Sequence, residues 1–184
     1  MNNPEKILAA LDRHLDQRTR IILYGRAALA LGYPGAAPEL GATVDVDAIL
    51  PSVEMAAIEN DRQFWQALDL ANRDLEPEGL YMTHLFSDDQ VILTPDWLLR
   101  IVALPSLGWR HLQGFRPSTL DLILTKMMRE DPQDLADIQF LLRQELLPRE
   151  MLHAAFSTAR VPAIDEIHAA FAANQPRVLA LALN

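Results

Sequence analysis

Apolar and polar positions follow two different periods in the first part of the chain, which predicts a mixture of helices and strands. Apolar residues at helical spacing predict an amphipathic helix over residues 4–17, with Asn3 as its cap and Pro4 at its first position. A short apolar run over residues 21–24 is typical of a buried strand. The alanine- and leucine-rich residues 26–31 favour a short helix directly after it.

A strict alternation in the first half of residues 43–50 predicts a strand that buries one of its faces. One face would carry Val44, Val46 and Ala48, and the other Thr43, Asp45 and Asp47. Two carboxylates are therefore expected on the same side of one strand.

The last third of the chain is helical in pattern, with prolines at the breaks. The expected fold class is α+β: a small mixed β-sheet with flanking helices, followed by a C-terminal helical bundle. We expect two parts, residues 1–116 and residues 117–184, that pack together. The remaining expected elements are a helix over 51–72, strands over 80–86 and 91–93 that form a hairpin, a strand over 112–116, and helices over 118–129, 132–144, 148–159 and 163–173.

The composition narrows the class of protein. Apolar residues make up 50% and charged residues 22% of the 184 positions, which is ordinary for a folded globular chain. The absence of cysteine excludes disulfides, thiolate zinc sites and cysteine nucleophiles. Because no apolar signal segment or bilayer-spanning run is visible, we expect a cytoplasmic protein without membrane contact.

The charge argues against a general nucleic-acid binder. The 16 lysines and arginines face 25 acidic residues, a net charge of −9, whereas phosphate contacts need clustered cations. A local basic groove stays open as an interpretation, although no run of lysine or arginine is present. Trp65, Trp97 and Trp109 are interpreted as core or interface residues rather than as base-stacking platforms.

The strongest candidate for chemistry is the pair Asp45 and Asp47. Like charges this close repel each other unless a cation lies between them. Oxygen ligands without neighbouring cysteine or histidine favour Mg²⁺ or Mn²⁺ over zinc. The alternative interpretation is a solvent-facing acidic pair on the exposed side of a half-buried strand.

The turn before this strand adds a second candidate site. Gly25 stands between the expected strand 21–24 and the helix that starts at Arg26. Glycine at such a turn lets backbone N–H groups approach a phosphate, and a helix N-terminus favours an anion. The alternative is a simple tight turn.

These residues resemble a known family. Residues 25–31 (GRAALAL) followed by residues 43–47 (TVDVD) are similar to the nucleotidyltransferase superfamily of DNA polymerase β. They look most like its AbiEii-like abortive-infection toxin branch and related uncharacterised bacterial proteins. Residues 121–129 (DLILTKMMR) and 133–138 (QDLADI) are similar to the lysine helix and the acidic segment of that branch. The resemblance covers roughly residues 20–145.

The resemblance implies a reaction and a set of roles. A nucleoside triphosphate would donate its nucleoside monophosphate to a hydroxyl or phosphate of an RNA or protein acceptor. The toxin branch implies a toxin–antitoxin system as the setting. A partner protein or a homodimer also fits the resemblance. The roles that it implies are Mg²⁺ (or Mn²⁺) binding by Asp45 and Asp47, catalysis by these two with Lys126, Asp134 and Asp137, and nucleotide binding by Gly25, Arg26, Thr43 and Arg129.

The residues of the second segment support two interpretations on their own. On an ideal helix Lys126 projects among apolar neighbours, and Asp134 and Asp137 lie at the edge of the apolar stripe of the next helix. Charged side chains at the boundary of a core are expected to contact a group of opposite charge. These three residues therefore either contact a ligand or form a buried lysine–aspartate bridge between two consecutive helices. Arg129 could instead cap the end of its helix.

Two departures from the family pattern keep further alternatives open. Arg26 stands where the family has a small residue, and the expected strands 80–86 and 91–93 contain no aspartate or glutamate. A catalytically degenerate relative that serves as a binding or regulatory module is the second hypothesis. The third is an unrelated domain with a chance Asp-x-Asp, which predicts that strands 21–24 and 43–49 are not neighbours.

Overall fold

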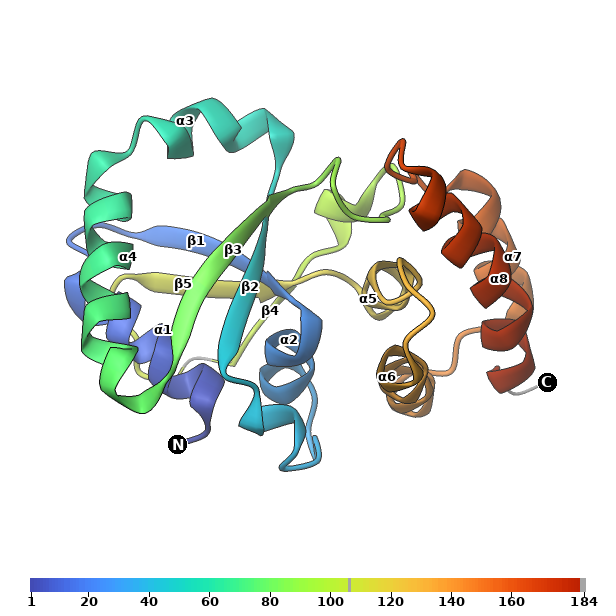
Figure 1. Cartoon of the computed structure of the whole chain (residues 1–184), viewed down its shortest axis with the longest axis horizontal. Helices are drawn as coiled ribbons and strands as arrows, with labels where there is room; N and C mark the ends of the chain where they lie inside the picture. The colour runs from blue at the N-terminus through green and yellow to red at the C-terminus, as the bar shows by residue number, and fades with distance from the viewer. Residues whose placement is uncertain (106, 183–184) are drawn as a thin grey trace. The chain divides into compact units, whose positions relative to one another are not determined.

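A five-stranded mixed sheet lies at the centre of the first of two units in the computed structural model, which describes residues 1–105 and 107–182 and leaves the side chains of residues 83 and 84 undescribed. The first unit contains residues 1–87 and 102–116, and the second contains residues 88–101 and the chain from Pro117 onward. The fold class is α+β, with a small mixed sheet, flanking helices and a C-terminal group of helices, as the sequence predicts (Figure 1).

The sheet has the strand order β3-β2-β1-β5-β4. β1 runs antiparallel to β2 and parallel to β5, while β2 and β3 are parallel and β4 and β5 antiparallel. Strands 21–24 and 43–49 are thus neighbours, which removes the hypothesis of an unrelated domain with a chance motif. The strands are β1 (Thr19–Tyr24), β2 (Asp45–Leu50), β3 (Tyr81–Ser87), β4 (Val102–Ala103) and β5 (Leu112–Arg116).

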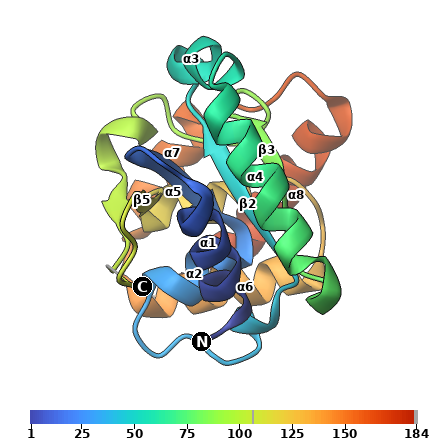
Figure 2. The ribbon, with the colours of Figure 1, turned by 90° about the vertical axis from the view of Figure 1, so that its left-hand side faces the viewer.

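One face of the sheet forms the core of the first unit. Ile21, Leu23, Val46 and Ala48 are buried on that face, and the helices α1 (Asn3–His14) and α4 (Arg62–Leu75) lie together over the sheet (Figure 2). Asp45 and Asp47 alternate with the buried residues of β2 and are half-buried. The predicted alternation is therefore confirmed from Asp45 to Ala48, but Val44 precedes β2 and is 48% exposed, and Ile49, on the face of the two carboxylates, is fully buried.

The first helix begins one residue earlier than predicted. Asn2, not Asn3, is the N-cap: its side chain accepts a hydrogen bond from the Glu5 N–H at 2.9 Å, and its own N–H donates to the Glu5 carboxylate at 2.9 Å. This reciprocal capping box satisfies two backbone groups at once, which favours Asn2 over its neighbour.

The helix predicted over residues 51–72 is wrong in extent. The chain forms a 3₁₀ turn (Ser52–Glu54), a short helix α3 (Met55–Glu59) and then α4. The break comes at Asp61, whose carboxylate accepts a hydrogen bond from the Phe64 N–H at 3.0 Å and so caps a new helix. Short polar side chains compete with the helical ladder in this way.

The hairpin predicted over residues 80–93 is also wrong. β3 forms, but the buried residues Val91–Leu93 leave the sheet and belong to the second unit. Leu93 makes an isolated bridge to Arg160, and the Thr94 N–H donates to the fully buried Asp121 at 2.9 Å. A short apolar run does not reveal its partner, and this partner lies far along the sequence.

The second unit is helical, and its boundaries differ in two places from those predicted. α6 matches its expected range of 132–144, whereas α5 ends early, at Thr125, and α8 passes through Pro176 instead of ending near residue 173. No helix in the described part of the chain is long and apolar enough to cross a membrane. The helices are α5 (Thr119–Thr125), α6 (Pro132–Gln144), α7 (Arg149–Thr158) and α8 (Asp165–Leu181).

A buried carboxylate joins α1 to the start of β5. Asp12 is 9% exposed and accepts hydrogen bonds of 2.8–3.1 Å from three consecutive backbone N–H groups, those of Arg110, His111 and Leu112. Burial opposes ionisation of Asp12, but these backbone donors outweigh it and hold the pKa of the carboxyl below its ordinary value. The ionised form of the Asp12 carboxyl is therefore the one that the folded protein favours.

We expect Asp12→Asn to lower the free energy of unfolding by about 2–3 kcal/mol, because hydrogen bonds to a charged acceptor are lost. The folded pKa is lower than the unfolded one of about 3.9, so this stabilisation is complete above the unfolded pKa and is lost as the pH falls through the folded pKa. Urea unfolding at pH 7 and below about pH 4 should show the difference between variant and wild type shrinking in acid.

The matched control is Asp16→Asn, which removes the same charge from an exposed position just after α1. An equal loss of stability in both variants, or a difference that does not depend on pH, would contradict the role of the Asp12 carboxylate.

Candidate functional site

The turn between β1 and α2 (Gly25–Gly32) lies directly against one of the predicted metal ligands. Tyr24, the last residue of β1, is paired with Asp47 of β2, so Gly25 follows opposite that carboxylate. Gly25 has φ +64°, and a Cβ placed on it would lie 3.5 Å from Oδ2 of Asp47. Glycine is favoured here by the left-handed backbone, and its missing side chain leaves the space beside the carboxylate open.

The N-terminus of α2 adds a partial positive charge at the same place. Tyr24 is its N-cap residue, and no side chain caps the first turn. The unbonded N–H groups of a first helical turn attract anions. A phosphate attracted there would lie near Asp47 and would be repelled by it, unless a cation sits between the two. The geometry therefore suits an anion that arrives together with a metal ion.

Asp45 is positioned by a neighbouring hydroxyl. Thr43 donates a hydrogen bond from Oγ1 to Oδ1 of Asp45 at 2.7 Å, and it ends the short turn Leu40–Ala42 that precedes β2. The pairing of β2 with β3 shifts register between Asp45 and Asp47. The extra residue of this irregularity belongs to β3, so the alternation that places Asp45 and Asp47 on one face of β2 is kept.

The carboxylates of Asp45 and Asp47 suit Mg²⁺ or Mn²⁺, because these ions can take their remaining ligands from phosphate and water. They do not suit a metal ion that is held by protein side chains alone. Among the described residues, no group of three or more histidine, cysteine, aspartate or glutamate side chains could hold an ion. Mg²⁺ is commonly held by one or two carboxylates, with phosphate and water oxygens completing its shell. Asp88, the first acidic residue after β3, accepts a hydrogen bond from the Trp97 indole at 3.1 Å within the second unit. It is a turn residue, as predicted.

Arg26 begins the first turn of α2 next to Gly25. Its side chain is half-buried, and its Nε is buried without a hydrogen-bond partner. Within the described part of the chain, no carboxylate forms an ion pair with it. A cation in this condition at a helix N-terminus strengthens the attraction for an anion.

Lys126 and its acidic partners form a second, separate cluster in the second unit. Lys126 Nζ lies 3.1 Å from Oδ1 of Asp134 and 2.6 Å from Oδ2 of Asp137, and all three side chains are less than a tenth exposed. Arg129, which is 65% exposed, also pairs with Asp134. The buried bridge between two consecutive helices, left open by the sequence, is present, and Arg129 pairs with α6 rather than capping α5.

Asn174 of α8 holds the turn that carries this cluster. Its amide donates to the carbonyl oxygens of Met127 at 3.4 Å and Arg129 at 2.9 Å. These contacts satisfy carbonyl groups beyond the end of α5 and explain why that helix stops early. Nothing in the local sequence pattern identifies Asn174, because its partners lie far away along the chain.

The structure thus gathers the predicted site residues into two groups. Gly25, Arg26, Thr43, Asp45 and Asp47 belong to the first unit, and Lys126, Arg129, Asp134 and Asp137 belong to the second. The first group joins carboxylates to a positive helix end, whereas the second is a set of paired charges.

The comparisons with known proteins agree with the superfamily. A family model described as a nucleotidyltransferase of unknown function (DUF6036) matches residues 5–160. No curated protein and no solved structure matches the chain. The family match includes both groups of predicted site residues.

We expect Lys126→Met to lower the free energy of unfolding by about 3–5 kcal/mol, because it leaves two buried carboxylates without their shared cation. Chemical denaturation measures this loss. Adding Asp134→Asn and Asp137→Asn should recover part of it, since the uncompensated charges are then removed.

Lys6→Met is the matched control, because Lys6 is the other lysine of the chain and pairs with Glu78 at the surface. Its loss should stay below about 1 kcal/mol. Equal losses in the two lysine variants would show that the buried bridge does not stabilise the second unit.

Proposed function

Because the chain belongs to the family of nucleotidyltransferases of unknown function (DUF6036), we propose that it transfers a nucleoside monophosphate from a nucleoside triphosphate to an acceptor. One observation carries this proposal: the glycine turn at the positive end of α2 faces the Asp47 carboxylate, so that a Cβ on Gly25 would lie 3.5 Å from Oδ2 of Asp47. A metal-bound triphosphate is the ligand that satisfies both charges, because it brings anionic oxygens and a cation together.

Asp45 and Asp47 would hold Mg²⁺ or Mn²⁺ in this proposal. Their chemistry fits such an ion, since hard carboxylate oxygens need only phosphate and water oxygens to complete its shell. When bound, the ion supplies charge neutralisation on the transferred phosphoryl group and on the departing pyrophosphate.

The other residues of the turn would bind and orient the triphosphate. Gly25 lets phosphate oxygens reach the backbone of α2, whose first N–H groups would donate to them. Arg26 would add a guanidinium donor to the same anion. Thr43 keeps the Asp45 carboxylate in one orientation through its 2.7 Å hydrogen bond, so that less order has to be gained when the nucleotide arrives. The proposal rests on the first unit alone, and a phosphate-binding role for Lys126 stays a prediction.

The acceptor is proposed to be a hydroxyl or phosphate of an RNA or of a protein. A net charge of −9 disfavours a long nucleic acid, which would need many cationic contacts. A short RNA end or a protein side chain needs few cationic contacts and is therefore compatible with the negative charge of the chain. The toxin–antitoxin setting and the AbiEii-like branch are supported by the resemblance of the motifs only.

We expect nucleoside triphosphates to stabilise the protein only when Mg²⁺ or Mn²⁺ is present. At about 100 times its dissociation constant, a ligand stabilises the folded state by about 2.7 kcal/mol, which corresponds to a rise in Tm of about 5–10 °C at this size. Thermal unfolding with each of the four ribonucleoside triphosphates measures the effect. It should vanish in Asp45→Asn/Asp47→Asn, and a shift that persists in this variant would place the nucleotide elsewhere.

Gly25→Ala tests the turn separately from the metal ligands. Alanine at φ +64° should lower the free energy of unfolding by about 1–2 kcal/mol, and its Cβ should also weaken the metal-dependent nucleotide shift. Gly35→Ala is the matched control, because Gly35 has φ +74° but open space around an added Cβ. We expect the two variants to be destabilised to a similar extent, and only Gly25→Ala to lose nucleotide binding. Equal nucleotide binding in both variants would contradict the proposed phosphate position.

A catalytically degenerate nucleotidyltransferase fold is the second candidate function. It is favoured by the absence of any aspartate or glutamate from β3, and by the use of Asp88 within the second unit. Incubation with triphosphates labelled at the α-phosphate, with the protein itself and with total RNA as acceptors, separates the candidates. Metal-dependent label that is lost in Asp47→Asn supports transfer. Binding without any transferred label would support the degenerate form.

A further inference from the structure

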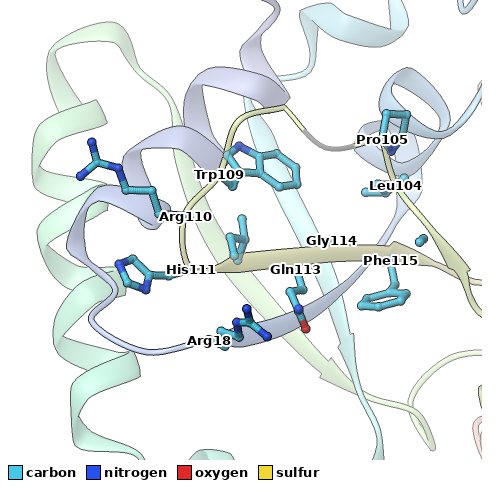
Figure 3. Close-up of a pocket in the computed structure, with 11 residues that line it drawn as sticks. Arg18, Leu104, Pro105, Trp109, Arg110, His111, Gln113, Gly114 and Phe115 are labelled. Atoms are coloured by element: carbon cyan, nitrogen blue, oxygen red, sulfur yellow. The ribbon is translucent and has the colours of Figure 1, made fainter.

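A cavity of about 380 Å³ lies in the first unit, along β5 and the chain that leads into it (Figure 3). Its volume falls within the range of about 300–1,000 Å³ that is typical of small-molecule sites. The chain around it runs from Leu104 into β5. In Figure 3, Arg18, which precedes β1, lies on the same side of β5 as Phe115, and Trp109 lies on the other side. None of the predicted site residues lines it.

The charge of this cavity is opposite to that of the chain. Arg18, Arg110 and His111 line it, and no aspartate or glutamate is among its described lining residues. The chain as a whole carries −9. Neither arginine side chain forms an ion pair with a carboxylate within the described residues. The nearest acidic group in the contacts of these residues is Asp12, which is buried and bound to the backbone N–H groups of the turn.

The cavity also has aromatic walls. Trp109 and Phe115 line it, and Trp109 is only half-buried. The indole lies close against the backbone of Gly114: a Cβ on this residue would be 2.9 Å from Trp109 Cζ3. The missing side chain at Gly114 therefore lets the tryptophan lie against β5. Gln113 adds an exposed amide that both donates and accepts hydrogen bonds.

We propose that this cavity binds a ligand that combines a phosphate with a nucleobase, either a free nucleotide or a nucleotide of a short single strand. Arg18 provides charge-assisted donors for the phosphate. Phe115, which lies on the same side of β5 as Arg18 and Gln113 in Figure 3, provides a flat apolar surface for the base, and such contacts tolerate every base because each has a π-face. Cations without carboxylate partners, beside exposed aromatic surface in an acidic protein, are better suited to this ligand than to a neutral or cationic one.

The position in the sheet fits a site that works beside the Gly25 turn. Phe115 is paired with Ile22, two residues before Tyr24, and Tyr24 is paired with Asp47. By the alternation of strand positions, Phe115 therefore shares the sheet face that carries Asp47. The binding proposed here does not need metal or transfer, so it stands or falls independently of the proposed function.

The test is isothermal titration calorimetry of the full chain with each probe, in a buffer that contains EDTA. The probes are adenosine 5′-monophosphate, inorganic phosphate, adenosine and a four-nucleotide oligoadenylate. We expect the monophosphate to bind at least about tenfold more tightly than phosphate or adenosine alone, because charge and stacking then add. Tighter binding of the oligoadenylate than of the monophosphate would identify a single strand as the source of the ligand, and equal binding would identify a free nucleotide.

Two variants locate the site. Arg18→Gln and Phe115→Leu should each weaken binding of the monophosphate about tenfold. Arg62→Gln is the matched control, since it removes the same charge from an exposed position on α4 outside the cavity. Thermal unfolding of each variant confirms that the fold is retained.

Four outcomes would overturn the proposal. They are no binding of any probe by the wild type at millimolar concentration, equal binding of phosphate and monophosphate, an equal loss in Arg62→Gln, and unchanged binding in both cavity variants. Loss of binding in Asp47→Asn without loss in Arg18→Gln would place the nucleotide at the Gly25 turn instead. That result would support the proposed function while contradicting the cavity.

Discussion

The antiparallel pairing of β1 with β2 sets the position of every candidate functional group in the first unit. It places Tyr24 opposite Asp47, and therefore brings the Gly25 turn and the start of α2 against a carboxylate of the neighbouring strand. A shift of one residue in this register would turn Asp45 and Asp47 into the core and expose Val46 and Ala48. Burial of these two apolar residues therefore opposes such a shift and keeps the acidic pair on the other face of the sheet.

The carboxylates of this chain serve two different purposes, and their surroundings show which. Asp12, Asp121 and Asp137 are buried and bound to groups that lie far away along the sequence or on another helix. Each of them joins elements that are distant in the sequence or lie on different helices. Asp45 and Asp47 are only half-buried, and Asp47 lies beside the turn that begins α2.

Two of the wrong predictions concern segments whose local structure depends on distant partners. The apolar residues 91–93 have the pattern of a strand, but Leu93 pairs with Arg160, and the next residue, Thr94, donates a hydrogen bond to Asp121 within the second unit. α5 stops early because Asn174 binds the carbonyl groups beyond its end. α6 and β5 also contact other elements, but they match their predicted ranges, because hydrophobic period and proline breaks were enough to define them.

The sequence by itself determined the α+β class, the Asp-x-Asp strand, the glycine turn before it and the resemblance to nucleotidyltransferases, because these depend on local period and residue type. It also predicted that Lys126 would have acidic partners, without deciding between a ligand site and a bridge. Only the tertiary structure decided that the Gly25 turn faces Asp47, that Lys126 is bridged to α6, and that Arg18 and Phe115 line one cavity. Those facts depend on strand register and on contacts between distant residues, which no local pattern contains.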